Sequence, residues 1–137
     1  MRTVKIDLGT ALDALSKIPE DVPIVMLNLL RFKEHADYGD RPNVVPCSGR
    51  EAFQQRYAQI IAPLMAADDS RLFWAGIVLA YVVAPADELW DDVALVEYPS
   101  VGAFRRLIED PRYQSEAAFH RTAALEDSRL IAMVKMS

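Results

Sequence analysis

The sequence predicts one α+β domain in which strands and helices alternate in the order β-α-β-β-α-β, after a short N-terminal helix. Two observations lead to this prediction. Four apolar runs have the length and composition of strands, and two longer segments carry apolar residues at helical spacing. The chain has 137 residues and contains no repeat, low-complexity tract or linker that would divide it. We therefore expect a single domain, residues 1–137, with one core.

The N-terminal helix is predicted from a capping pattern. Thr10 is followed three residues later by Asp13, an arrangement typical of a helix start. Leu12 and Leu15 then follow at helical spacing, and Pro19 ends the segment. We expect a short helix with one apolar side.

The first strand, Pro23–Phe32 (PIVMLNLLRF), contains two polar residues in an otherwise apolar run. These are Asn28 and Arg31. Burying an amide or a guanidinium is unfavourable unless each is hydrogen-bonded or paired. They therefore serve a pocket, an interface or a structural network. Side chains alternate along a strand, so Asn28 and Arg31 face opposite sides of the sheet.

The middle of the chain predicts a loop, a helix and a second strand. The polar stretch Lys33–Cys47 is an irregular loop insertion, long enough to be functional. Ser48 opens a helix with a capping box, and Pro63 should kink or end it. The apolar run Leu72–Val83 is the second strand, and Gly76 within it indicates a bulge or a close approach.

The C-terminal part predicts a strand, two helical segments and a final strand. Val93–Tyr98 is the third strand, and Ser100 caps the helix that follows it. Asp110-Pro111 begins another helical segment, because an N-cap followed by proline is a favoured helix start. Arg129–Met136 is the last strand.

This order of elements is the split βαβ, or ferredoxin-like, arrangement, in which an antiparallel four-stranded sheet carries helices on one face. The first strand is apolar on both faces, with Ile24 and Met26 on one side and Val25 and Leu27 on the other. No other segment is large enough to cover the second apolar face. We therefore predict that a second copy of the chain covers it, which makes the protein a homodimer.

Composition excludes several classes of partner. The formal net charge is −5 and no basic stripe is present, which argues against binding to nucleic acid or to anionic membranes. No apolar stretch has the length of a transmembrane helix, and the N-terminus lacks a signal-peptide pattern. The single Cys47 fits a reducing cytoplasm. One Cys and two His are too few for a typical structural zinc site, and no phosphate-binding glycine motif is present, so we expect neither a metal nor a bound cofactor.

The C-terminal third resembles a known family. A strand ends in Glu-aromatic-Pro-Ser, and after a helix come a Pro-x-Tyr turn, an arginine and an Asp-containing link to the final strand. The matching residues are Glu97, Tyr98, Pro99, Ser100, Pro111, Tyr113, Arg121 and Asp127. This pattern resembles the domain-of-unknown-function family 1330, which belongs to the dimeric α/β-barrel superfamily, and the resemblance extends over residues 23–136.

The resemblance implies a dimeric α/β barrel built from two ferredoxin-like subunits, but it implies no reaction. The superfamily contains cofactor-independent monooxygenases, haem-degrading enzymes, lactone isomerases and proteins without known activity. Fold alone does not fix function. The chain also departs from the family pattern, because Asp69-Ser70 replaces a Gly-Gly pair before Arg71 and the Lys33–Cys47 loop is longer.

Three residues are candidates for catalysis, each with a structural alternative. Asn28 either orients a substrate oxygen as a hydrogen-bond donor or ties down strand backbone. Glu97, on an apolar strand, either moves a proton or forms an ion pair with Arg121 or Arg31. His120 is either a general base or haem ligand, or a structural residue.

Five further residues are candidates for ligand binding. Arg31 either clamps an anion or pairs across the dimer, and Arg121 either meets a ligand or pairs with Glu97. Tyr98 is a phenol donor or a core residue. Tyr57 and Trp74 either line a pocket for a flat organic molecule or fill the core.

These residues leave three functions open. The first is a small enzyme without a cofactor, an oxygenase or an isomerase, that holds an apolar molecule between sheet and helices. The second is a non-catalytic dimer that binds a metabolite or a protein. The third, a haem-degrading monooxygenase, needs His120 as its ligand. An enclosed pocket shared by Asn28 and at least one of Glu97, His120 and Tyr98 would favour the first.

Overall fold

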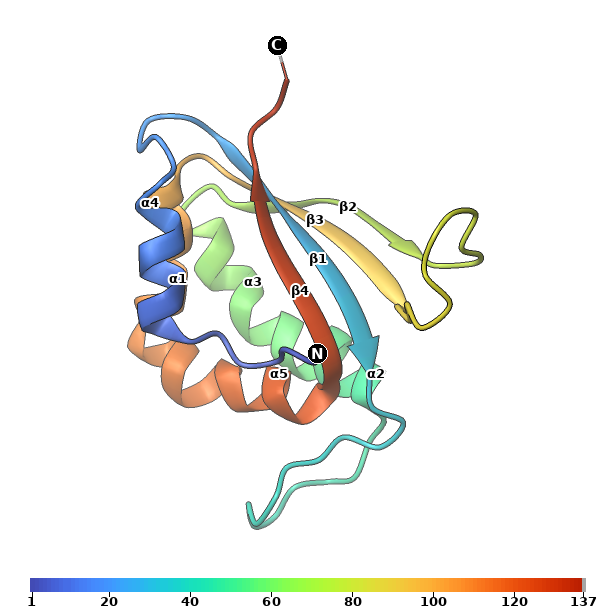
Figure 1. The fold of residues 1–137 in the computed structure, drawn as a ribbon. Coiled ribbons are helices and arrows are strands. Elements are labelled where there is room, and N and C mark those ends of the chain that lie inside the picture. Colours follow the sequence, from blue (N-terminus) through green and yellow to red (C-terminus); the bar gives the residue numbers. More distant parts are fainter. Residues whose placement is uncertain (137) are drawn as a thin grey trace.

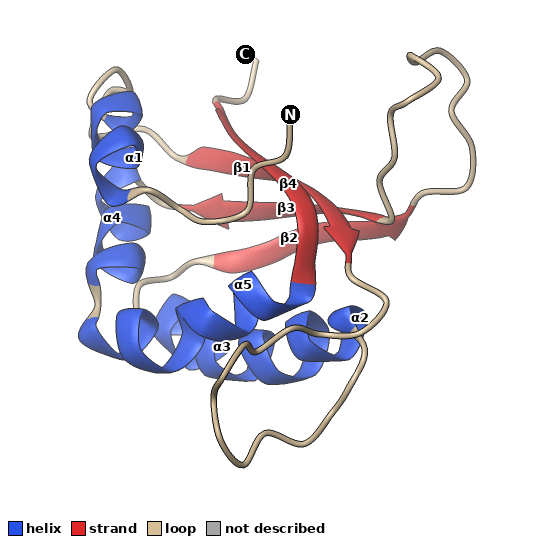
Figure 2. Cartoon of the chain, turned by 60° about the horizontal axis from the view of Figure 1, so that its bottom comes forward, coloured by secondary structure: helices blue, strands red, loops and turns tan. Residues whose placement is uncertain are grey.

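The computed structural model describes residues 1–136 and has one antiparallel sheet of four strands in the order β2-β3-β1-β4. Helices lie on one side of this sheet (Figures 1 and 2). The elements are α1 (Leu8–Leu15), β1 (Ile24–Phe32), α2 (Gly49–Glu51), the π-helical η1 (Ala52–Tyr57), α3 (Ala58–Ala66), β2 (Arg71–Ile77), β3 (Asp92–Tyr98), α4 (Val101–Glu109), the π-helical η2 (Tyr113–Ala117), α5 (Ala118–Ala124) and β4 (Leu125–Met133). The predicted α+β, ferredoxin-like order is confirmed.

Helix starts follow the predicted caps with one exception. The side chains of Ser48 and Ser100 accept hydrogen bonds from the backbone N–H groups of Glu51 and Ala103, as expected for N-caps. The prediction that Thr10 caps α1 is wrong. Asp7 is the cap, and its carboxylate accepts from the Thr10 N–H at 2.9 Å.

The helix that begins after Ser48 does not end at Pro63. It continues to Ala66, with Pro63 inside α3. Proline removes one backbone N–H, which leaves the carbonyl one turn earlier without its usual donor. Pro63 is exposed, so water can solvate that carbonyl, and the helix is tolerated.

The predicted boundaries differ most for β2 and β4, and β4 ends at Met133 rather than Met136. Strand β2 ends at Ile77 rather than Val83, because its ladder with β3 ends at the pair Ile77–Asp92 and only one further backbone hydrogen bond, from Val78 to Asp91, follows. Strand β4 begins at Leu125 rather than Arg129. Leu125 is already extended at the end of α5 and pairs with Phe32.

Strand β2 also contains a bulge. The register with β3 shifts between Leu72 and Trp74, which makes Phe73 the extra residue. The predicted special role of Gly76 is a close approach by a side chain. A Cβ there would lie 2.4 Å from the Trp74 ring, so only glycine lets this indole lie across the strand.

Alternation along β1 divides the sheet into two faces. Ile24, Met26 and Leu30 are buried on the face that carries the helices, which we call the helix-covered face. The opposite face, which we call the bare face, carries no helix or strand of residues 1–136 (Figure 2). Strand register and the bulge put on it the side chains of Val25, Leu27, Leu29, Phe73, Trp74, Val93, Leu95, Ile131 and Met133. Trp74 is 55% exposed and Ile131 is 46% exposed.

Candidate binding cavity

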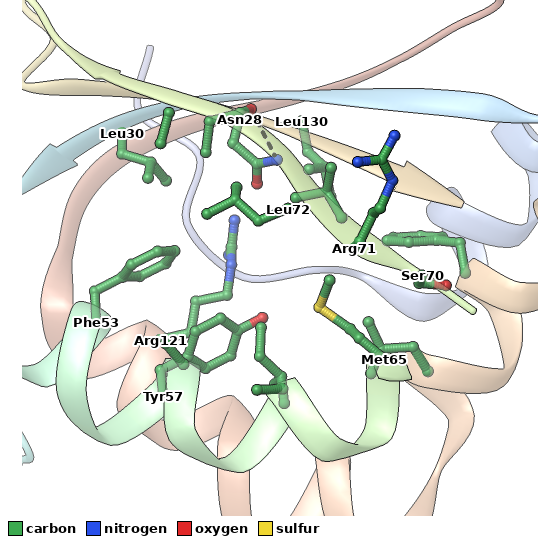
Figure 3. A pocket seen from close by; sticks show the side chains of 18 of the residues that line it. Asn28, Leu30, Phe53, Tyr57, Met65, Ser70, Arg71, Leu72, Arg121 and Leu130 are labelled. Atoms are coloured by element: carbon green, nitrogen blue, oxygen red, sulfur yellow. Dashed lines mark hydrogen bonds between the residues drawn. The ribbon is translucent and has the colours of Figure 1, made fainter. Parts of the chain in front are cut away.

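A cavity of about 500 Å³ lies between the helix-covered face of the sheet and the helix formed by η1 and α3 (Figure 3). Residues of β1 and β3 form one wall, and a stripe along η1 and α3 forms the other. Most of the lining is aliphatic or aromatic. It includes Leu30, Phe53, Ile61, Met65, Leu72, Val96, Phe104 and Leu130.

The cavity opens to solvent between α3 and the edge strand β2. Several of its lining residues are exposed, and all of these lie on those two elements or within η1. They are Gln54, Ala62, Arg71, Leu72 and Ala75. Because β2 is the outermost strand, no further strand closes this side. A small molecule therefore has a route between α3 and β2 into the interior.

The inner end of the cavity is polar. The phenol oxygens of Tyr57 and Tyr113 are 2.8 Å apart and both side chains are buried. Burial raises the pKa of Tyr57 well above its usual range, and burial likewise raises the pKa of Tyr98 and Tyr113. All three phenols are therefore neutral at physiological pH and keep their O–H donors. Tyr57 and Tyr113 each lie in a π-helical segment, a feature frequent at functional sites.

Asn28 faces this cavity, but its amide nitrogen is occupied. Nδ2 donates to the carbonyl oxygens of Met26 at 3.2 Å and Ala94 at 3.4 Å. An amide has two N–H donors, and both are used on backbone. Asn28 therefore ties β1 to β3, and the group it can present to a ligand is the acceptor Oδ1. The expectation that it donates to a substrate oxygen does not fit this arrangement.

Arg121 reaches the cavity from α5, and its guanidinium points between Tyr57 and Leu72 (Figure 3). It donates to the carbonyl of Val4 and to Ser128 Oγ. The predicted ion pair of Glu97 with Arg121 or Arg31 is wrong.

Glu97 forms an ion pair with Arg71 instead, with Nε and Oε1 3.0 Å apart. The physical reason is register. Glu97 lies opposite Val25 and Arg71, so its side chain is on the bare face, whereas Arg121 approaches the helix-covered face.

His120 lies outside the lining of this cavity and has a structural contact. Its Nδ1 is 2.7 Å from the hydroxyl of Tyr38, which belongs to the loop 33–47. The Arg41 guanidinium of the same loop lies 3.7 Å from the centroid of the Phe119 ring. Burial, together with the charges of Arg56 and Arg41, lowers the pKa of His120. His120 therefore holds the loop on α5, and no residue of this loop lines the cavity.

The structure thus brings together four of the eight predicted site residues. Asn28, Tyr57, Tyr98 and Arg121 line one cavity. The other four lie elsewhere. Glu97, Arg31 and Trp74 are on the bare face, and His120 contacts the loop. Of Glu97, His120 and Tyr98, only Tyr98 lines a cavity with Asn28, and this cavity is open to solvent rather than enclosed.

Sequence reasoning missed two groups in the cavity. Tyr113 was noted only as part of a motif, and its partner Tyr57 is 56 residues away. Asp92 accepts from Arg50 at 2.7 Å and from Gln54 at 3.1 Å, on the cavity wall near Leu30. Its position at the start of a strand and the capped helix opposite are visible in the sequence, but their contact depends on the tertiary fold.

A cluster of metal-ligating side chains and a membrane-spanning helix are both absent from residues 1–136. These residues contain no group of three or more His, Cys, Asp or Glu side chains placed to hold a metal ion. No helix in the same part of the chain is long and apolar enough to cross a membrane.

Comparison with solved structures gives two crystal structures of one similar protein, RPA0582, that span almost the whole chain. One is a crystal structure of the methylated RPA0582 protein, with a TM-score of 0.86, 34% sequence identity, and coverage of 100% of this chain and 98% of that one. The other is RPA0582, a protein of unknown function from Rhodopseudomonas palustris, with a TM-score of 0.84, 36% identity, and coverage of 98% and 99%. The chain belongs to the RPA0582 family. RPA0582 has the same fold and is itself a protein of unknown function.

More distant structures agree on the fold alone. An uncharacterised NIPSNAP-like domain protein from Burkholderia xenovorans has a TM-score of 0.51 at 18% identity, and covers 85% of this chain and 88% of its own. A dabb family protein with a ferredoxin-like fold from Mesorhizobium loti has a TM-score of 0.52 at 12% identity, with 84% and 98% covered. No protein-family model and no curated protein matches the chain. Membership of family 1330 therefore stays a prediction.

Proposed function

We propose that the protein binds a small apolar metabolite in the cavity between the helix-covered face and the helix η1–α3. The observation that carries this proposal is the cavity itself, about 500 Å³ in volume, apolar along its walls and polar at its inner end. Ligand sites in proteins have this size and this combination of apolar lining with a few placed polar groups. Exposed residues on α3 and β2 give the ligand its route of entry.

Binding is better supported than catalysis. An oxygenase or isomerase that pairs Asn28 with Glu97 or His120 needs groups that this chain holds apart, on opposite sheet faces or at a loop contact. A haem-degrading activity needs a histidine at the cavity, and His120 is not part of its lining. The neutral phenols of Tyr57 and Tyr113 and the acceptor of Asn28 are suited to holding and orienting a polar group.

We also propose that the protein acts as a homodimer whose bare faces pack together. Contiguous exposed apolar surface of this kind is typical of an interaction site. The segment 78–91, which leaves the sheet after β2, adds three more apolar side chains. Leu79, Val82 and Val83 are each 94% exposed in one chain. A two-fold arrangement would let the same residues cover one another, as in most homodimers.

Calorimetric titration with two neutral apolar probes, 1-decanol and 2-naphthol, tests the binding proposal. We expect saturable binding of at least one probe, with one site per chain, and a negative heat-capacity change from apolar burial. Light scattering of the same sample should give the mass of two chains at micromolar concentration. Absence of saturable binding up to the solubility limit of both probes would contradict the proposed function.

A further inference from the structure

Arg121 is a buried cation that has no carboxylate partner among residues 1–136. Its exposed fraction is 5%, and its hydrogen bonds go to two neutral oxygens, the Val4 carbonyl and Ser128 Oγ. Within residues 1–136, every ion pair involves other side chains. A guanidinium has five N–H donors, so several remain for another partner. Removing a charge from water is costly, and buried cations are normally paired.

The other charged groups of the cavity already have partners. Asp92 is held by the guanidinium of Arg50, and Arg71 at the mouth is paired with Glu97. Arg121 therefore contributes the uncompensated positive charge at the inner end. Its field acts on both phenols there, since it opposes the rise that burial causes in the pKa of Tyr57 and Tyr113. This end of the cavity is arranged to receive negative charge.

We propose that the ligand of this cavity is an apolar monocarboxylate whose carboxylate binds the Arg121 guanidinium. The inference rests on the proposed function and adds to it the chemical class of the ligand. Tyr57 and Tyr113 lie beside Arg121, and because one of their hydroxyls donates to the other, the pair keeps one O–H donor for the carboxylate. The hydrocarbon or aromatic body lies toward the mouth, along a wall that includes Phe53, Met65 and Leu72.

A carboxylate fits this end better than a phosphate. A planar guanidinium matches a planar carboxylate with two parallel hydrogen bonds. A phosphate brings up to two negative charges and more acceptor oxygens, and the cavity offers one unpaired cation. The apolar lining also excludes a ligand that is polar along its whole length.

The test compares decanoate with 1-decanol, which has the same chain length without the charge, and with decyl phosphate. In the wild-type protein we expect decanoate to bind at least tenfold more tightly than 1-decanol, as charge-assisted hydrogen bonds are the strong ones. Decyl phosphate should bind no more tightly than decanoate. Tighter binding of decyl phosphate would overturn the assignment to carboxylates.

Substitution of Arg121 tests whether its guanidinium causes the preference for decanoate over 1-decanol. Arg121→Met should remove the preference for decanoate while 1-decanol still binds, and Arg121→Lys should restore part of it. Arg106→Met is the matched control, because Arg106 lies outside the cavity lining and is paired with Asp68. It should leave the preference within about twofold. Retention of the preference for decanoate in Arg121→Met would overturn the assignment of the carboxylate to Arg121.

The two proposals fail in different ways. If 1-decanol binds and decanoate binds no more tightly, the inference about the carboxylate is overturned and the proposed function stands. If neither probe binds to the wild-type protein, the proposed function itself is contradicted. If Arg121→Met does not fold, the inference about the carboxylate is tested by two other measurements. These are the affinities of the wild-type protein for decanoate and 1-decanol, and the same affinities of Arg121→Lys.

Discussion

The two faces of the sheet are made by the same four strands and differ in what this chain supplies to cover them. On the helix-covered face, Ile24 is fully buried and Met26 is 3% exposed. On the bare face, Trp74 and Ile131 are 55% and 46% exposed, although they are equally apolar. Helices cover the first face and leave a cavity beneath them. No helix or strand of residues 1–136 covers the second.

This contrast shows how one strand serves two purposes. A period of two sends alternate residues of β1 to different environments, so a single sequence run encodes both a cavity wall and an assembly surface. Asn28 belongs to the cavity wall, and Arg31 belongs to the assembly surface. The faces are chemically separable, and a substitution on one should leave the function of the other intact.

The largest effect is expected for Ile131→Glu on the bare face. Burying an unpaired carboxylate in an apolar interface costs several kcal/mol, which corresponds to roughly a hundredfold weaker dimer or more. Analytical ultracentrifugation of the variant should show monomers at concentrations where the wild-type protein is dimeric. Binding of 1-decanol should be retained. A variant that remains fully dimeric would contradict the bare face as the interface.

The next largest effect is expected for Ala58→Trp, which places an indole in the cavity from the start of α3. The added ring occupies the volume that the ligand needs, so we expect at least tenfold weaker binding of 1-decanol by calorimetry. Gln59→Trp, at the next and exposed position, is the control and should bind as the wild type does. Both variants should remain dimeric. Normal binding by Ala58→Trp would place the ligand elsewhere.

Ion pairs on the two faces should differ in their contribution to stability. Asp92 is buried and accepts from Arg50 and Gln54, so Asp92→Asn should lower the free energy of unfolding by about 1–3 kcal/mol. Glu97→Gln breaks the more exposed pair with Arg71 and should cost less than about 1 kcal/mol. Urea denaturation in the monomeric Ile131→Glu background measures both without a contribution from assembly. An equal loss of unfolding free energy in Asp92→Asn and Glu97→Gln would contradict the explanation by burial.

The smallest effect is expected at His120, which belongs to neither face. Its pKa is lowered in the folded state from 6.5, so the unfolded chain takes up a proton first as the pH falls. The contribution of His120 to the free energy of unfolding is therefore fully present above about pH 6.5. It decreases as the pH falls toward the lowered pKa. His120→Gln should remove this part of the pH dependence, measured by thermal unfolding between pH 7 and pH 5, roughly the range in which histidine titrates.

Two comparisons complete the His120 prediction. His35→Gln, in the exposed part of the loop, is the matched control for removal of an imidazole. Binding of 1-decanol should be unchanged in His120→Gln, since this side chain does not line the cavity. Loss of binding would show that His120 serves the site after all.

Local patterns were sufficient to predict the order of the elements. The alternation along β1 and the caps at Ser48 and Ser100 depend on residues within a few positions of one another, so they are visible in the sequence. The end of β2 could not be predicted from local patterns, because Leu72–Val83 is apolar throughout. Where the pairing stops depends on the start of β3 at Asp92.

The candidate site was predicted in part for the same reason. Asn28 stood out because a polar side chain in an apolar run needs a partner, and Arg121 stood out through the family resemblance and as a possible partner of Glu97. Which partner it finds depends on register and helix placement. Glu97 pairs across β2–β3 with Arg71, and Tyr57 meets Tyr113 between two helices, contacts that no local spacing encodes.

The central claim, that the helix-covered face holds the ligand and the bare face holds the second chain, is tested most directly by methyl-resolved NMR. One sample is titrated with 1-decanol and then diluted. The account predicts that 1-decanol shifts the methyl signals of Met65 and Leu72, whereas dilution shifts those of Leu27 and Ile131. Ligand-induced shifts confined to Leu27 and Ile131 would contradict it.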